Sequence, residues 1–126
     1  MIHEKFHYAT KEELLETAKS VGGSLPMSDD TSVLFQKVEK NGICLENRFA
    51  IQPMEGCDAE PSGVPSELTM RRYDRFARSG AGLIWAEAVA ILPEGRAKPR
   101  QLRIDEDNLD AFKKMVEDIK ETSMKE

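Results

Sequence analysis

Two apolar runs, each followed by a loop that contains Pro and Gly, constrain the fold of this chain most. The first run spans residues 48–52 and leads into Pro53-Met54-Glu55-Gly56. The second spans residues 82–88 and is followed by Leu92-Pro93-Glu94-Gly95. Buried parallel strands have this pattern where they leave a sheet, and α/β proteins place their functional groups at such strand ends. We therefore expect two strands whose ends share one site.

A helix is predicted between these two strands. Ser66 is a suitable N-cap residue, and an apolar stripe at helical spacing follows it. The stripe consists of Met70, Tyr73, Phe76 and Ala77. Because Gly80 is a typical helix stop, we expect the helix over residues 66–79. A helix between two strands calls for a parallel pair with a right-handed crossover.

A second helix is predicted over residues 105–121. The carboxylates of residues 105–107 suit the positive end of a helix dipole. The predicted buried face consists of Leu109, Phe112, Val116 and Ile119. The order strand, helix, strand, helix makes the chain α/β. Two parallel strands alone leave unpaired edges and uncovered apolar faces, so we expect further strands or other chains to complete the sheet.

Residues 1–31 are predicted to be an N-terminal helical extension and linker. Thr10 and Glu13 have the spacing of a capping box, in which each side chain bonds the other residue's backbone amide. Gly22-Gly23 then provides a left-handed stop. Turn-forming residues fill the remainder of this segment, which separates the helix from residues 32–126.

Residues 33–45 are predicted to form a β-hairpin. Asn41-Gly42 lies between two apolar segments, and both residue types tolerate the positive φ that a tight hairpin turn requires. A two-stranded hairpin is marginally stable by itself. We therefore expect it to cover a neighbouring core.

The acidic charge balance excludes several classes of partner. The net charge of the 126 residues is −5, which opposes binding to nucleic acids and anionic membranes. Basic residues gather on the predicted helix at Arg71, Arg72, Arg75 and Arg78, where acidic neighbours favour a solvated face over a nucleic-acid patch. No apolar run approaches the roughly 20 residues of a membrane span. Two cysteines without metal spacing and an N-terminus without an apolar signal region favour the cytoplasm.

Three side chains near the predicted strand ends are candidates for chemistry. Glu55 and Glu87 form an acid/base pair if they lie close together. Alternatively, Glu87 pairs with an arginine or accepts a hydrogen bond from a backbone amide. Cys57 is either a nucleophile or a passive thiol that lines a pocket, and no histidine follows it to activate it.

A possible zinc motif lies at the N-terminus. His3-Glu4-Lys5-Phe6-His7 has the literal H-E-x-x-H spacing of zinc peptidases. The motif requires a rigid helix in a cleft, whereas chain termini are the least ordered segments of most domains. A chance match is therefore the favoured interpretation, and no metal is expected.

Six short segments, taken in order along the chain, carry a family resemblance. They are Asn47–Met54, Gly63–Leu68, the helix around Tyr73, Ser79–Ile84, Glu87-Ala88 and Pro93–Arg96. Together they resemble the old yellow enzyme family of FMN-dependent NADH:flavin oxidoreductases, over a stretch from about Leu34 to Lys120. No single segment is specific, but the ordered set is. The hairpin also fits, because the family closes the bottom of its barrel with one before the first strand.

The resemblance implies a partial TIM (β/α)8 barrel. Residues 32–126 correspond to the N-terminal part of the FMN-binding barrel, with a hairpin cap followed by the first two βα units. By position, Gln52, Pro53, Met54 and Glu55 lie along the FMN ring, and Ala88 is the small residue beside it. The implied reaction passes a hydride from NAD(P)H through the flavin to a small electron-poor acceptor such as an activated alkene.

The chain departs from the family pattern at two positions in the predicted substrate pocket. Glu55 stands where the family usually has Thr or Cys, and Cys57 is near a position where some members have Tyr. The family's substrate ligands, flavin-contacting arginine and proton donor have no counterparts here, so no catalytic residue is assigned. We expect the 126 residues alone to be inactive and to need the remainder of a barrel or a homo-oligomer. The alternative is a non-catalytic interaction module of half-barrel form.

Overall fold

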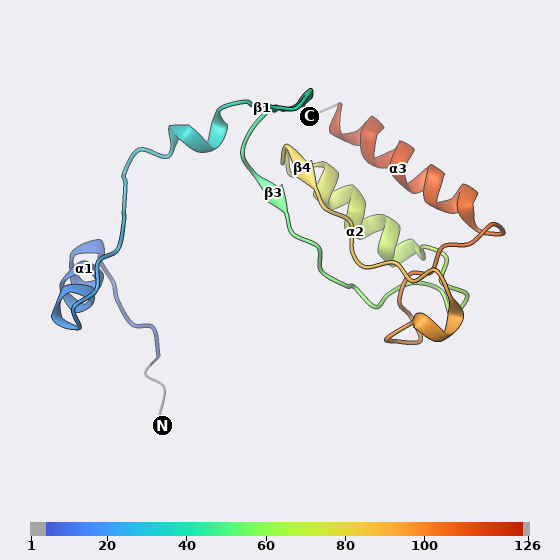
Figure 1. Ribbon diagram of the computed structural model, residues 1–126, viewed down its shortest axis with the longest axis horizontal. Helices are drawn as coiled ribbons and strands as arrows, with labels where there is room; N and C mark the ends of the chain where they lie inside the picture. Colours follow the sequence, from blue (N-terminus) through green and yellow to red (C-terminus); the bar gives the residue numbers. More distant parts are fainter. Residues whose placement is uncertain (1–4, 125–126) are drawn as a thin grey trace. The chain divides into compact units, whose positions relative to one another are not determined.

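The structure, a computed structural model, describes residues 5–124 (Figure 1). The chain divides between Thr31 and Ser32 into two compact units, which are described separately. Within residues 5–124, no helix combines the length and the apolar character needed to cross a membrane.

The first unit contains helix α1, Lys11–Ser20. The Thr10 hydroxyl accepts a hydrogen bond from the Glu13 amide at 3.2 Å, as predicted. The Glu13 carboxylate, however, accepts from the amide of Ala9 at 2.9 Å instead of that of Thr10, so the predicted capping box closes one residue earlier. Gly22 has a φ of 75° and ends the helix in the expected left-handed conformation.

The second unit begins with a 3₁₀ turn, η1, Ser32–Phe35, followed by the hairpin strands β1, Val38–Lys40, and β2, Ile43–Leu45. The strands are antiparallel, and Asn41 and Gly42 have φ values of 53° and 79°, as the sequence predicts. The prediction that the hairpin starts at residue 33 is wrong. The 3₁₀ turn lets the Leu34 carbonyl accept from the amide of Arg48 at 2.8 Å and brings the rings of Phe35 and Phe49 within 5.3 Å.

A parallel βαβ unit follows the hairpin. Strand β3, Ala50–Ile51, pairs with β4, Leu83–Ile84, and helix α2, Glu67–Ala77, connects them (Figure 1). Both strands are shorter than the predicted 48–52 and 82–88. The last ladder hydrogen bond joins the Trp85 amide to the Ile51 carbonyl at 3.0 Å, because Pro53 has no amide hydrogen with which to continue the pairing.

The Asn47 side chain fixes the start of this parallel pair. Its Oδ1 accepts from the amides of Phe49 and Gly82 at 3.0 and 2.8 Å, and its Nδ2 donates to the Gly80 carbonyl at 2.7 Å. One side chain therefore joins the segments that enter both strands.

Replacing Asn47 with alanine should lower the free energy of unfolding by about 1–2 kcal/mol, because the amides of the exposed Phe49 and the half-buried Gly82 and the Gly80 carbonyl lose their partner. Denaturant unfolding of the complete polypeptide that carries this sequence measures the loss. Asn47→Asp keeps the acceptor oxygen and loses only the donor, so it should retain more of the stability. Equal stability of the alanine variant and the unchanged protein would contradict this role.

Helix α2 begins and ends close to the predicted positions. Ser66 and Thr69 form a reciprocal capping box, with both amide-to-hydroxyl distances at 3.3 Å. Tyr73 and Ala77 are buried on the predicted face. Beyond the helix, Gly80 has a φ of 71°, which agrees with its predicted role as a stop.

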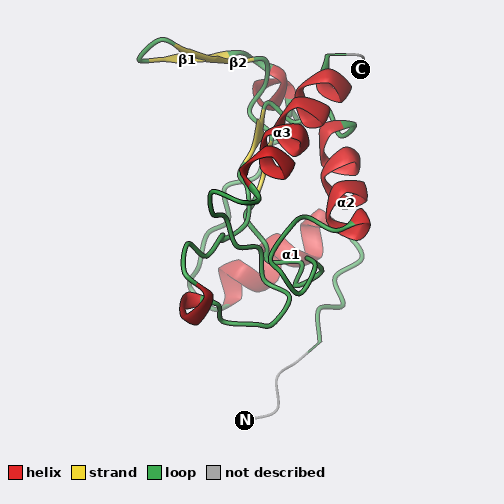
Figure 2. Ribbon diagram, turned by 90° about the vertical axis from the view of Figure 1, so that its right-hand side faces the viewer, coloured by secondary structure: helices red, strands yellow, loops and turns green. Residues whose placement is uncertain are grey.

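Helix α3, Leu109–Ser123, begins later than predicted. Asp105 forms a turn before the helix, in which its carboxylate accepts from the amides of Asp107 and Asn108 at 3.1 Å. The predicted buried face is also shifted: Phe112 and Met115 are buried, whereas Val116 is 45% exposed. Helices α2 and α3 lie side by side (Figure 2), and this packing selects Met115 over Val116.

The core lies on the helical side of the parallel pair. Its buried members are Ala59, Tyr73, Leu102, Phe112 and Met115. On the sheet, Leu83 is 37% and Trp85 65% exposed. The prediction that the second strand is buried on both faces is therefore wrong for this chain, because no layer of the described residues covers its other face.

Candidate functional site

The ends of β3 and β4 place the predicted flavin-facing residues at one edge of the parallel pair. Gln52, Pro53, Met54 and Glu55 follow β3 and are all exposed, and so is Ala88 after β4. Within residues 5–124, no backbone group of Gln52–Glu55 takes part in a hydrogen bond. We call Gln52–Glu55 together with Ala88 the strand-end wall. Its free backbone groups are available to a ligand.

Glu87, which directly precedes Ala88, connects the end of β4 to the loop after β3. Its side chain is 1% exposed, and its Oε1 pairs with Arg72 Nη2 at 2.5 Å. Its Oε2 accepts from the Gly56 amide at 3.1 Å. The hypothesis that Glu87 pairs with an arginine or accepts from a backbone amide is confirmed, since it does both. Its carboxylate is engaged in holding the loop.

Tyr73 supports Glu87 from helix α2. Its hydroxyl accepts from the Glu87 amide at 2.9 Å and donates to Glu87 Oε1 at 3.3 Å. Burial raises the pKa of Tyr73, so the hydroxyl keeps the proton that it donates. Sequence periodicity identified Tyr73 as a core residue but gave no indication of this polar role.

Arg72 is the centre of the buried network. Its Nε and Nη2 donate to the two carboxylate oxygens of Asp58 at 3.0 and 2.9 Å, and Nη2 also reaches Glu87. The Asp58 hydrogen bond is the main cause that raises the pKa of Arg72, so its charge is permanent. The prediction of a solvated arginine face is wrong for this residue, whose side chain is only 21% exposed. The reason is that two carboxylates from loops approach the helix, which helical periodicity does not reveal.

Asp58 fixes the loop after the strand-end wall. Thr69 Oγ1 donates to Asp58 Oδ1 at 2.8 Å, in addition to the two bonds from Arg72. The Arg72 guanidinium, helped by Thr69, holds the pKa of Asp58 below its ordinary value and outweighs the opposing effect of burial. Asp58 is therefore a structural carboxylate of this site.

Stability should depend on pH through Asp58. A carboxyl with a lowered folded pKa stabilises the fold above its unfolded pKa of about 3.9, and this contribution is lost as the pH falls through the folded pKa. We expect Asp58→Asn to be less stable near neutral pH and to lose stability less steeply below about pH 5. Urea midpoints of the complete polypeptide from pH 7 to pH 3 measure this. Asp110→Asn, which removes an exposed carboxylate, should follow the unchanged protein. Parallel curves for the Asp58 variant and the unchanged protein would contradict the prediction.

Glu55 contacts a different set of groups from Glu87. Glu55 Oε1 accepts from Gln101 Nε2 at 3.4 Å, and Cys57 Sγ lies 4.0 Å from Glu55 Oε2. The two carboxylates are thus held by separate partners, and the contacts of Glu87 disfavour the acid/base pair. Cys57 is half-buried, with a φ of 48° that is unusual for a residue other than glycine.

The loop after β4 supplies the support for Glu55. Gln101 is buried, and its Oε1 accepts from the Ala97 amide at 2.7 Å. Arg96 donates to the Pro61 and Gln101 carbonyls, both at 2.7 Å, which ties the loop to the segment after the wall. Sequence analysis named Arg96 only as part of the resemblance and missed Gln101, since a glutamine in a polar loop has no distinguishing pattern.

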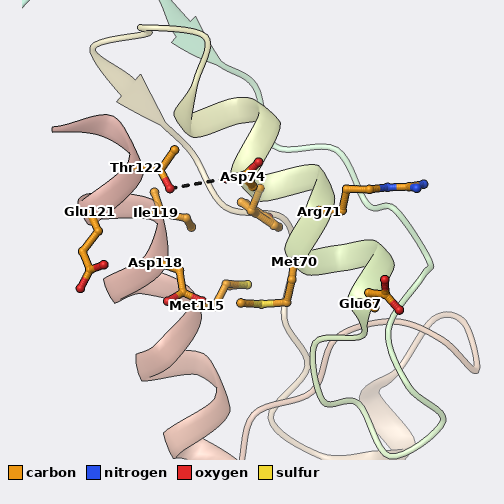
Figure 3. Close-up of a pocket in the computed structure, with 10 residues that line it drawn as sticks. Glu67, Met70, Arg71, Asp74, Met115, Asp118, Ile119, Glu121 and Thr122 are labelled. Carbon is orange, nitrogen blue, oxygen red and sulfur yellow. Dashed lines mark hydrogen bonds between the residues drawn. The ribbon is translucent and has the colours of Figure 1, made fainter. Parts of the chain in front are cut away.

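A separate groove of about 420 Å³ lies between α2 and α3 (Figure 3). Met70 and Met115 point toward one another across it, and Arg71 points away. Thr122 Oγ1 donates to Asp74 Oδ1 at 3.4 Å at one end. No member of the strand-end wall lines this groove.

Of the possible zinc motif, His3 and Glu4 lie outside the described residues. Among residues 5–124, no three His, Cys, Asp or Glu side chains are grouped as a metal site would require.

The sequence model of one protein family matches most of the chain. The NADH:flavin oxidoreductase / NADH oxidase family matches residues 33–125, which include both βα units described above. The chain belongs to this family. The resemblance noted in the sequence is therefore confirmed, and so, at the level of the family, is the prediction of FMN as cofactor with NAD(P)H as reductant.

Individual relatives match the same region. An NADPH dehydrogenase of Bacillus pumilus is 33% identical over 91 residues, which are 69% of this chain and 26% of that protein. The structure of morphinone reductase in complex with tetrahydroNAD superposes with a TM-score of 0.61 at 29% identity, covering 71% of this chain and 24% of that one. The structure of the old yellow enzyme homologue from Zymomonas mobilis superposes with a TM-score of 0.61 at 27% identity, and the match covers 71% of this chain and 25% of that one.

These matches identify the fold as α/β and as part of a TIM barrel. The chain spans about a quarter of the length of the relatives that it matches. The fit of the hairpin β1–β2 as a barrel cap stays a prediction.

Proposed function

We propose that this chain forms the first two βα units of an FMN-dependent oxidoreductase of the old yellow enzyme type. In the complete barrel, bound FMN would accept a hydride from NAD(P)H and pass it to an electron-poor acceptor such as an activated alkene. The observation that carries the proposal is the strand-end wall, whose backbone groups are free, in a chain that belongs to a flavin-binding family. The cysteine usage favours the cytoplasm as its location.

The residues of the wall fit a flavin ring. Gln52, Met54 and Glu55 offer backbone amides and carbonyls that no group of the described chain occupies, and these suit the polar edge of the ring. Ala88 is exposed and small, so it leaves room for a flat ligand. The flavin supplies the hydride chemistry when it is bound, and these residues would hold and orient it.

The 126 residues supply only part of what such an enzyme needs. A TIM barrel has eight strands and usually binds phosphate with the loops after strands 7 and 8. In this chain the apolar face beside β4 is open, with Trp85 65% and Ile91 73% exposed. We propose that further strands of a complete barrel, or another copy of the chain, cover this face, and that the 126 residues alone are inactive.

The complete polypeptide that carries this sequence tests the function. It should copurify with FMN, shown by the visible absorption of a bound flavin, and should oxidise NAD(P)H faster when an activated alkene is added. A colourless protein that takes up no FMN on reconstitution would overturn the proposal.

The open apolar face also favours a second candidate, a non-catalytic half-barrel module that pairs with a partner. The size of the 126-residue chain in solution separates the two candidates. A stable, colourless assembly of defined stoichiometry would support the module, whereas aggregation that is relieved only in the complete polypeptide would support the enzyme.

A further inference from the structure

The strand-end wall is held in place by side chains rather than by the β-ladder. The last ladder hydrogen bond involves Ile51 and Trp85, so Gln52–Glu55 and Ala88 lie beyond the paired backbone. Beyond that point, the two strand ends are joined by the hydrogen bond from the Gly56 amide to Glu87 Oε2 at 3.1 Å. The spacing of the two halves of the wall therefore depends on where the Glu87 carboxylate is held.

Arg72 holds that carboxylate and the loop at the same time. Its Nη2 atom donates both to Glu87 at 2.5 Å and to Asp58 at 2.9 Å, while Nε donates to Asp58 at 3.0 Å. Asp58 follows the wall after β3, and Glu87 directly precedes Ala88. The planar fork of one guanidinium thus joins the segments that flank both halves.

The close approach of Gly56 shows that this arrangement is specific. A Cβ atom at Gly56 would lie 2.3 Å from Arg72 Nη2 and 2.5 Å from its Cζ. The guanidinium therefore packs directly against the backbone of the loop. Neutralising Glu87 alone would need only a point charge, whereas here two nitrogens of the guanidinium, Nε and Nη2, are both bonded to carboxylates.

We propose that Arg72 is a positioning residue for the strand-end wall: it sets the distance between Gln52–Glu55 and Ala88 by bridging Asp58 and Glu87. This inference rests on the proposed function, because the wall is assigned to FMN there. Arg72 itself belongs to helix α2 and not to the strand-end wall, and it is not assigned a contact with the flavin.

Arg72→Lys in the complete polypeptide tests the inference. Lysine keeps the positive charge beside Glu87 but has no second, rigidly placed nitrogen with which to bond Asp58 at the same time. Two quantities are measured: hydrogen exchange of the Gly56 amide in the flavin-free protein, and the dissociation constant for FMN. Arg75→Lys, an exposed position on the same helix, is the matched control.

For Arg72→Lys we expect exchange of the Gly56 amide, which donates to Glu87, to rise at least about tenfold, exchange in α2 to stay unchanged, and FMN to bind at least about tenfold more weakly. The control should match the unchanged protein. The double variant Arg72→Met/Glu87→Gln removes the charge pair altogether, and it should also bind FMN weakly even where its thermal stability is restored.

Three results would overturn the inference or its basis. If FMN binds to the unchanged protein and Arg72→Lys alters neither exchange nor affinity, Arg72 does not position the wall, although the proposed function stands. If exchange of the Gly56 amide rises but the affinity for FMN is unchanged, the strand-end wall that Arg72 holds is not the FMN site. If the unchanged protein binds no FMN, the proposed function fails, and the exchange measurement still decides whether Arg72 holds the loop.

Discussion

Replacing Gly56 with alanine is expected to lower the free energy of unfolding by about 2–4 kcal/mol. The added Cβ would lie 2.3 Å from Arg72 Nη2, which forces the guanidinium out of its place between Asp58 and Glu87. The Glu87 side chain, 1% exposed, then loses its charge partner. The estimate begins below the roughly 3–5 kcal/mol of fully broken buried pairs, because the Arg72 side chain is 21% exposed and its guanidinium is displaced instead of removed.

Chemical denaturation of the complete polypeptide measures this loss, and a double variant identifies its cause. In Gly56→Ala/Arg72→Met the clash is absent, so the second substitution should add far less than its own separate effect. Gly95→Ala is the control for the gain of a methyl group, since the nearest atom to its Cβ would be 4.0 Å away. Additive effects of the two substitutions would show that the clash with Arg72 is not the cause.

Replacing Glu55 with glutamine is expected to raise the midpoint potential of the bound flavin. If the proposed wall lies along the ring, the Glu55 carboxylate places a negative charge beside it and disfavours the anionic reduced form. Removing one charge of this kind should raise the potential by on the order of 20–50 mV. Glutamine keeps the size of the side chain and an oxygen that can accept from Gln101.

Spectroelectrochemical titration of the complete flavoprotein measures this potential. Glu60→Gln is the matched control, because it removes the same charge from an exposed side chain of the same loop. An unchanged or lowered potential in the Glu55 variant would contradict the prediction. An equal rise in both variants would trace the effect to the net charge of the protein.

Sequence patterns predicted the elements whose signals are local. The Asn41-Gly42 turn and the Ser66 cap lie where expected, because turn and cap preferences depend on neighbouring residues. The stripe through Tyr73 also placed helix α2 correctly. Strand lengths were overestimated, because apolar composition does not report where backbone pairing stops.

The hydrogen-bond network of Arg72, Asp58 and Glu87 was harder to predict for a physical reason. Arg72 looks like any exposed helical arginine in the sequence, and only the loop that brings Asp58 to it reveals its role. Met115 was missed in favour of Val116, since the two differ by one helical position and tertiary packing decides between them. The alternative for Glu87, a structural ion pair, was foreseeable because a buried carboxylate needs a partner.

The bond between Gly56 and Glu87 also bears on the order of folding. It joins residues 31 positions apart, and the bonds from Arg72 span 14 and 15 positions. Closing these loops costs less chain entropy than closing the longer loops that pairing with a later segment would require. As the polypeptide leaves the ribosome, this network should therefore assemble once Glu87 has emerged, ahead of any strand made later. In the proposed barrel, the edge of β4 would then present a preformed template for pairing with a third strand.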